Sequence, residues 1–155
     1  MKDLLPVPKN SLPASWRGQS LLEVLVAMAV AILIVGGLVV AVIVAVRNAQ
    51  FAKNQTLATK YANEGMEWIR SERDTDWTIF AARSGPPPGG TTYCLNNLSW
   101  ASLPCSFSLA NNTFKREAVL ITREADRKIE AKVTVSWTDP AGTHKSELTS
   151  YFTKW

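Results

Sequence analysis

One uninterrupted apolar run, Val24–Val46, constrains this chain more than any other feature of its sequence. Its 23 residues include no charged side chain and no Asn, Gln or His. As an α-helix with a rise of about 1.5 Å per residue, the run would extend roughly 35 Å, enough to cross a hydrocarbon core about 30 Å thick. Val and Ile are moderate helix formers in water, but in lipid every backbone N–H and C=O must bond within the segment. We therefore predict a transmembrane helix, with a buried core helix as the alternative.

The segment before this run, Met1–Gly18, is polar and contains three prolines, which discourage a helix. A secretory signal peptide would place an apolar region of about 7–15 residues before a small-residue cleavage site. Here the apolar run is longer, and the small residue, Gly18, comes before it. Glu23 stands at the edge of the run. This order of glycine, acid and apolar helix differs from that of a secretory signal.

The spacing Gly-x4-Glu from Gly18 to Glu23, followed at once by the apolar run, resembles the N-terminal motif of the type IV prepilin family. This family includes type IV pilins and the pseudopilins of type II secretion. The sequence that starts at Leu21, Leu-Leu-Glu-Val-Leu-Val-Ala, is most similar to the same segment of minor pilins of the V type and pseudopilins of the I type. The resemblance implies that a prepilin peptidase at the inner membrane cuts between Gly18 and Gln19 and removes residues 1–18. The family usually has Phe at the first mature position, where it is N-methylated; this chain has Gln19.

Glu23 would become the fifth residue of the mature chain. A carboxylate in a membrane helix costs about 2.5–3.5 kcal/mol at the centre and less near the interface, so it usually has a partner. The resemblance implies a role in assembly, in which this carboxylate meets the free α-amino group of a neighbouring subunit. The alternative is local: Ser20 as the helix N-cap, with Glu23 three residues later completing a capping box.

The helical pattern continues beyond the apolar run, where Arg47 marks the water interface. Apolar residues recur there at spacings of three, four and seven: Phe51, Ala58, Ala62, Gly65, Met66 and Ile69. Such a face packs against a sheet, so we predict a soluble helix over 47–76 as the second half of one helix from about Ser20 to Asp74. We interpret the acidic residues between its arginines as a solvated surface rather than a catalytic or metal site: Glu64, Glu67, Glu72, Asp74 and Asp76.

A segment rich in Gly, Pro, Asn and Ser, 78–112, follows the helix and is predicted to be a long variable loop. It holds both cysteines of the chain. We predict that Cys94 and Cys105 form a disulfide, with two unrelated free thiols as the alternative. A disulfide indicates an oxidising compartment for this part of the protein.

The C-terminal segment, 113–155, is predicted to form an antiparallel sheet. Apolar and polar residues alternate from Ile129 to Trp137, as in a half-buried strand. A turn then leads into a hairpin partner over 144–155, and an earlier strand is expected at about 114–122. Three or four strands would cover the soluble half of the helix.

Together these elements predict an α+β, pilin-like fold, in which one long N-terminal helix packs on a small antiparallel sheet. Its parts are a cleaved leader (1–18), the transmembrane and filament-core half of the helix (19–46) and a soluble head domain (47–155).

The sequence has no pattern typical of an enzyme: no Ser/His/Asp set, no cluster of metal ligands and no phosphate-binding glycine motif. We therefore expect no catalytic residue, no metal and no cofactor. The net charge of +4 is not gathered into a basic stripe, so a nucleic-acid partner is not indicated.

The resemblance implies a structural subunit, a minor pilin or pseudopilin, of a type IV pilus or type II secretion-like filament. Its partners would be a prepilin peptidase, other pilin subunits, the inner-membrane assembly platform and membrane lipid. Before assembly it would be a single-pass protein of the inner (cytoplasmic) membrane with an extracytoplasmic head. Two alternatives stay open: a binding module at a filament tip, such as an adhesin or DNA-uptake pilin, and an uncleaved, signal-anchored membrane protein.

Overall fold

The computed structural model describes residues 16–124 and 128–154, with side chains from Leu21 onward. One helix, α1 (Trp16–Thr75), contains 60 residues. The chain divides into two compact units, residues 1–48 and 49–155, and α1 contributes to both. All of the described strands belong to the second unit.

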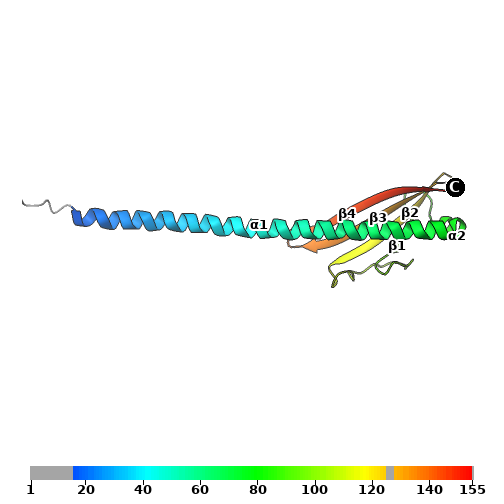
Figure 1. Cartoon of the computed structure of the whole chain (residues 1–155), viewed down its shortest axis with the longest axis horizontal. Coiled ribbons are helices and arrows are strands. Elements are labelled where there is room, and N and C mark those ends of the chain that lie inside the picture. The colour runs from blue at the N-terminus through cyan, green and yellow to red at the C-terminus, as the bar shows by residue number, and fades with distance from the viewer. Residues whose placement is uncertain (1–15, 125–127, 155) are drawn as a thin grey trace, which may run out of the picture. The chain divides into compact units, whose positions relative to one another are not determined.

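A four-stranded antiparallel sheet lies against the C-terminal part of α1 in the second unit (Figure 1). A short helix, α2 (Trp77–Ala82), follows α1 directly. The strands lie in the order β1-β2-β3-β4, with the bounds β1 Thr91–Cys94, β2 Phe114–Glu124, β3 Lys128–Asp139 and β4 Gly142–Thr153. The predicted α+β, pilin-like fold class is confirmed.

The buried face of the sheet follows from the alternation of apolar and polar residues. In β3 five apolar side chains at every second position are fully buried: Ile129, Ala131, Val133, Val135 and Trp137. The register of β2 and β3 places Phe114 opposite Trp137 and Leu120 opposite Ala131, so buried residues meet across the strands. Because only one face of the sheet is apolar, that face needs a cover.

The soluble part of α1 supplies this cover. Four residues of the predicted amphipathic face are at most 2 % exposed: Ala58, Ala62, Met66 and Ile69. Phe51 is 41 % exposed, but its ring centroid lies 6.1 Å from that of Trp137 and 5.1 Å from that of His144. The face predicted from spacing is therefore the face that packs on the sheet.

The start of α1 differs from the prediction. The helix begins at Trp16, so Ser20 lies inside it and is not its N-cap; the alternative of a capping box with Glu23 is wrong. After Pro13, only Gly18 disfavours the helix, and one glycine costs about 1 kcal/mol, which a helix of this length tolerates.

The other end of α1 is set by Asp76, which has an extended backbone conformation with φ −156° and ψ 107°. Its carboxylate accepts hydrogen bonds from the backbone N–H groups of Thr78 (2.7 Å) and Ile79 (3.0 Å). Asp76 is therefore the N-cap of α2, and α1 ends one residue earlier, at Thr75.

The segment predicted as a loop, 78–112, contains most of α2 and the whole of β1. The sheet therefore begins before residue 113. Glycines and prolines dominate the composition of this segment, and a strand of four residues is too short for alternation to reveal it. Trp155, at the end of the predicted hairpin, lies outside the described residues.

Replacing Ile69 by Ala should lower the free energy of unfolding by about 2–5 kcal/mol, because this side chain is fully buried in the core formed by α1 and the sheet. The matched change Ile79→Ala should cost less than about 0.5 kcal/mol, since Ile79 is 57 % exposed on α2. Denaturant titration of the full chain in detergent, followed by tryptophan fluorescence, measures both. Equal losses would contradict the packing of α1 on the sheet.

Candidate functional site

The apolar half of α1 is an exposed surface. Every large apolar side chain from Leu21 to Val46 is between 46 % and 75 % exposed. Within the described residues, this is the one helix long and apolar enough to cross a membrane. Contiguous apolar surface of this extent marks a membrane or protein contact, because water alone is a poor solvent for it. The helix can lie in lipid or pack against other apolar helices.

Glu23 is the charged residue at the edge of this surface. It is the eighth residue of α1 and is exposed. Its carboxylate makes no hydrogen bond or ion pair with any side chain that the structure describes. A carboxylate beside a lipid-facing segment is costly without a partner.

The predicted cleavage bond, between Gly18 and Gln19, lies in the first turn of α1. For a peptidase that binds an extended chain, this turn would have to open before the predicted cleavage. Gly18 weakens the turn, because glycine disfavours a helix by about 1 kcal/mol and helix ends fray. Residues 1–15 of the predicted leader lie outside the described part of the chain.

The predicted disulfide between Cys94 and Cys105 is present, with the Cα atoms 5.2 Å apart. The chain has no free cysteine. The bond joins the end of β1 to the segment that leads into β2, and so closes the loop 95–104.

A buried arginine, which the sequence analysis missed, holds this loop against α1. Arg116 lies in β2 on the same face as Phe114 and Ala118, and its side chain is 1 % exposed. Arginine is almost never fully buried unless it is paired. The signal was present in the sequence: an arginine occupies an apolar-face position of an alternating strand.

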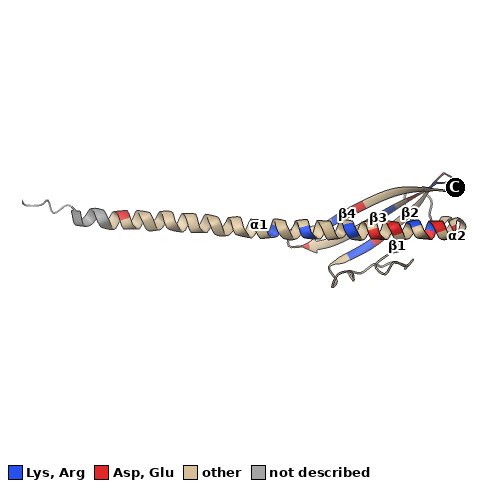
Figure 2. Ribbon diagram, viewed as in Figure 1, with Lys and Arg blue, Asp and Glu red and all other residues tan. Residues whose placement is uncertain are grey.

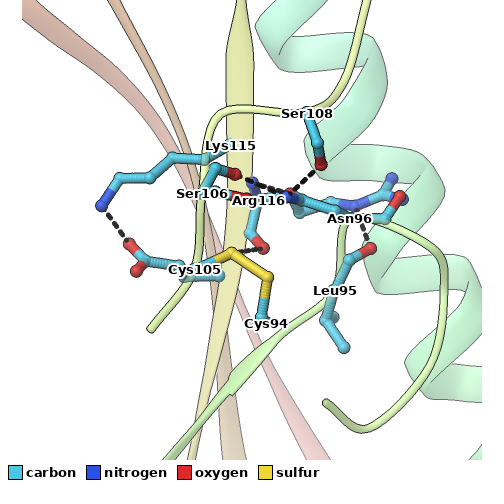
Figure 3. Close-up of a disulfide and its surroundings, with 9 residues drawn as sticks. Cys94, Leu95, Asn96, Cys105, Ser106, Ser108, Lys115 and Arg116 are labelled. Carbon is cyan, nitrogen blue, oxygen red and sulfur yellow. Dashed lines mark hydrogen bonds and ion pairs between the residues drawn. A yellow bond between two sulfur atoms is a disulfide. The ribbon is translucent and has the colours of Figure 1, made fainter. Parts of the chain in front are cut away.

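The Arg116 guanidinium donates to groups on both α1 and the loop, and Figure 3 shows its contacts on the loop side. On α1 its Nη1 donates to the carbonyl of Tyr61 (2.9 Å) and to the Oε2 atom of Glu64 (3.0 Å). On the loop its Nε donates to the carbonyl of Leu95 (3.0 Å), and its Nη2 to that of Asn96 (3.4 Å). One side chain thus connects three segments that lie far apart in the sequence.

Burial lowers the pKa of Arg116, and the hydrogen bond and charge of Glu64 act in the opposite direction. Glu64 keeps half of its side chain in water, so only one of the two charges is desolvated. Gly65 makes the close approach of the arginine to α1 feasible. A Cβ atom on Gly65 would lie 2.9 Å from Cδ of Arg116 and 3.3 Å from Cγ1 of Val133.

Asn96 extends the network to the far side of the loop. Its Oδ1 accepts a hydrogen bond from the backbone N–H of Arg116 (2.7 Å). Its Nδ2 donates to the carbonyl of Ser106 (2.7 Å) and to the hydroxyl of Ser108 (2.6 Å). Sγ of Cys105 lies 3.5 Å from the Arg116 carbonyl oxygen. This is a van der Waals contact, because a disulfide sulfur carries no proton to donate. The disulfide and the Asn96 network therefore fix the same loop.

The acidic residues of α1 are a solvated surface only in part. Glu67 and Asp74 are exposed, as predicted. Glu64 is exposed as well, and so is Asp76, which follows α1 and caps α2. Glu72 instead is half-buried and accepts a hydrogen bond from Nε1 of Trp100 (2.7 Å). Among the residues that the structure describes, no group of three or more His, Cys, Asp or Glu side chains is placed to hold a metal ion.

The chain was also compared with known proteins. No family model, no curated protein and no solved structure matches it. The fold and the geometry of its sites therefore define its class: an α+β protein with one membrane-compatible helix, a head packed on that helix and a disulfide-bonded loop.

Arg116→Met should lower the free energy of unfolding by about 2–3 kcal/mol, because it removes four hydrogen bonds from a buried charged donor. The loop 95–104 should also become more sensitive to limited proteolysis. The matched change Lys115→Met, one residue earlier on the other face of β2, should cost no more than about 0.5 kcal/mol. Denaturant titration and mass-mapped proteolysis report both effects; an unchanged loop in Arg116→Met would refute its anchoring role.

Proposed function

We propose that this chain is a structural subunit, a minor pilin or pseudopilin, of a type IV pilus or type II secretion-like filament. One observation carries the proposal. Glu23, five residues after Gly18, is a carboxylate with no partner among the described side chains, and it stands at the edge of an exposed apolar helix. A soluble protein would cover such a helix, and a simple anchor would have no need for the acid.

Cleavage between Gly18 and Gln19 would supply a positive charge that can pair with Glu23. It creates an α-amino group at the start of the mature helix, near the apolar edge where Glu23 lies. In an assembly of parallel helices, the amino group of one subunit can neutralise Glu23 of the next as both leave the lipid. Pairing of opposite charges in an apolar surrounding offsets the cost of leaving either one alone there. The apolar helices would then cover one another.

Before assembly the subunit would lie in the inner membrane through the apolar half of α1, with the head outside the cytoplasm. The Cys94–Cys105 disulfide supports this orientation, because disulfides persist in oxidising compartments. A prepilin peptidase, the assembly platform, membrane lipid and other filament subunits would be its partners.

The mature N-terminus tests the processing step. Membrane-extracted protein should begin at Gln19 when a prepilin peptidase is present and at Met1 when the peptidase is absent. Intact mass and N-terminal sequencing distinguish the two chains, which differ by the 18 leader residues. A chain that begins at Met1 under both conditions would leave a signal-anchored membrane protein in place of a pilin.

Glu23→Gln should leave processing unchanged and reduce the share of processed chain in the sheared filament fraction at least tenfold. The amide keeps the shape of the side chain but cannot neutralise an amino group, and about 1.4 kcal/mol of lost pairing is a tenfold effect. The control is Glu124→Gln, an exposed carboxylate at the end of β2. Normal filament yield with Glu23→Gln would refute a role of this carboxylate in assembly.

A further inference from the structure

Gln19 is the part of the N-terminal sequence that the proposed function leaves unexplained. It follows the predicted cleavage bond directly, at the position where the resembled family usually has Phe. Cleavage would make it the first residue of the mature chain. A glutamine in this position has a reactivity that phenylalanine lacks, because its side chain carries an amide carbon that its own α-amino group can attack.

The reaction closes a ring within one residue. The amine nitrogen attacks the side-chain carbon Cδ, a new N–Cδ amide bond forms, and the bond from Cδ to the side-chain nitrogen breaks. That nitrogen leaves as ammonia, with the proton that the amine gives up, so no oxidant, reductant or other reactant is needed. Both groups belong to the same residue, and the closure is therefore unimolecular. The product, pyroglutamate, is a five-membered lactam without a charge.

The state of the nitrogen decides whether the ring can close. In the uncleaved chain this nitrogen belongs to the Gly18–Gln19 peptide bond, where resonance occupies its lone pair. After cleavage the neutral amine has a free lone pair, and a fraction of ordinary α-amino groups is neutral near neutral pH. An amine that is paired with a carboxylate stays protonated and has no lone pair for the attack. Cleavage therefore starts the reaction, and ion pairing slows it.

The α-amino group would be the one positive charge in the apolar half of the mature helix. Glu23 makes no hydrogen bond or ion pair with any described side chain. The next basic residue on α1 is Arg47, about 36 Å further along the helix. Figure 2 shows the stretch of α1 between them without a charged residue. Arg17, which precedes Glu23, would leave with the leader. Loss of the amine would therefore remove the cation available for pairing in this region.

We propose that Gln19 is a modification site: it closes to pyroglutamate in processed chains that have not assembled, and so removes this charge. The inference rests on the proposed function, since cleavage creates the reactive amine. A chain with the ring keeps its apolar helix but has no amino group for Glu23 of a neighbouring subunit. An assembled chain keeps its amine, because the ion pair holds it protonated. Ring closure thus excludes from the filament the chains that stay longest in the membrane.

The surroundings of an isolated subunit favour the ring. The positive end of the helix dipole disfavours an ammonium group at the start of a helix. The edge of a lipid-facing segment likewise disfavours an unpaired charge. Only the ion pair with a neighbouring Glu23 favours the open, protonated form. The chemical state of Gln19 therefore depends on whether the chain has a neighbour.

A time course of the processed chain tests this dependence. The full chain is expressed in the cell that makes this protein, synthesis is stopped, and the membrane fraction and the sheared filament fraction are collected over hours. Mass spectrometry of the N-terminal peptide separates the open terminus from the ring, which is lighter by one molecule of ammonia. A synthetic peptide with the same free terminus and heavy isotopes, added at lysis, corrects for ring closure during preparation.

We expect the share of ring in the membrane fraction to rise with time. It should exceed the share in the filament fraction about fivefold, the reduction in free amine that about 1 kcal/mol of ion pairing produces. The matched control is Gln19→Met, which keeps an unbranched side chain of similar length but has no carbonyl carbon to attack. Its terminus should stay open in both fractions, and a larger share of its processed chain should reach filaments after the same delay.

An open terminus in both fractions throughout the time course, with or without an N-methyl group, would overturn the proposal. Equal shares of ring in the two fractions would overturn it as well, because assembly would then give the amine no protection. Both results concern chains that begin at residue 19 and leave the processing step intact. A chain that begins at Met1 in the presence of the prepilin peptidase contradicts the filament function itself, so the two failures are distinguishable.

Discussion

The structure depends on one constraint: a single helix must suit two different surroundings. Over Leu21–Val46 α1 is apolar on every side and exposed throughout, which suits lipid or other apolar helices. Over residues 49–75 it is apolar on one side only and packs there on the sheet. The change occurs at Arg47, the first charged residue after the apolar run. Because the head needs only the second half of α1 for its core, the first half stays available for contacts outside the chain.

The loop beyond β1 is held by polar contacts because it has few apolar side chains to bury. Arg116 replaces an apolar residue on the inner face of β2 and bonds to carbonyl groups of Leu95 and Asn96. A buried cation is destabilising unless its donors are satisfied, and here backbone carbonyls and the half-exposed Glu64 satisfy them. The position of the loop therefore depends on the position of α1, since Gly65 must leave room for the arginine.

The elements whose apolar residues follow a regular period could be predicted from the sequence. The apolar run, the amphipathic face around Ala62 and the alternation in β3 each cover many residues, so a single deviation does not hide the period. The features that depend on a contact between two particular residues could not be predicted in this way. The buried ion pair of Arg116 with Glu64 and the strand β1 depend on tertiary contacts that spacing does not encode. The Asp76 cap is local, with hydrogen bonds to residues 78 and 79, but the helix that it caps has only six residues, too few to show a period. The alternative role of Ser20 as a cap rests on residue type alone, and α1 continues through this position.

The two faces of the head differ in how their charges are used. On the outer face of the sheet the charges are satisfied internally: Arg123 pairs with Glu130, and Glu147 lies between Lys145 and Lys132, which hold the pKa of its carboxyl below the ordinary value. On the exposed side of α1, Lys53 and Lys60 have no such partner in the described structure. An exposed charge without a partner gains more Coulomb energy from an opposite charge than one that is already paired. The exposed side of α1, more than the outer face of the sheet, therefore carries charges that a partner could neutralise.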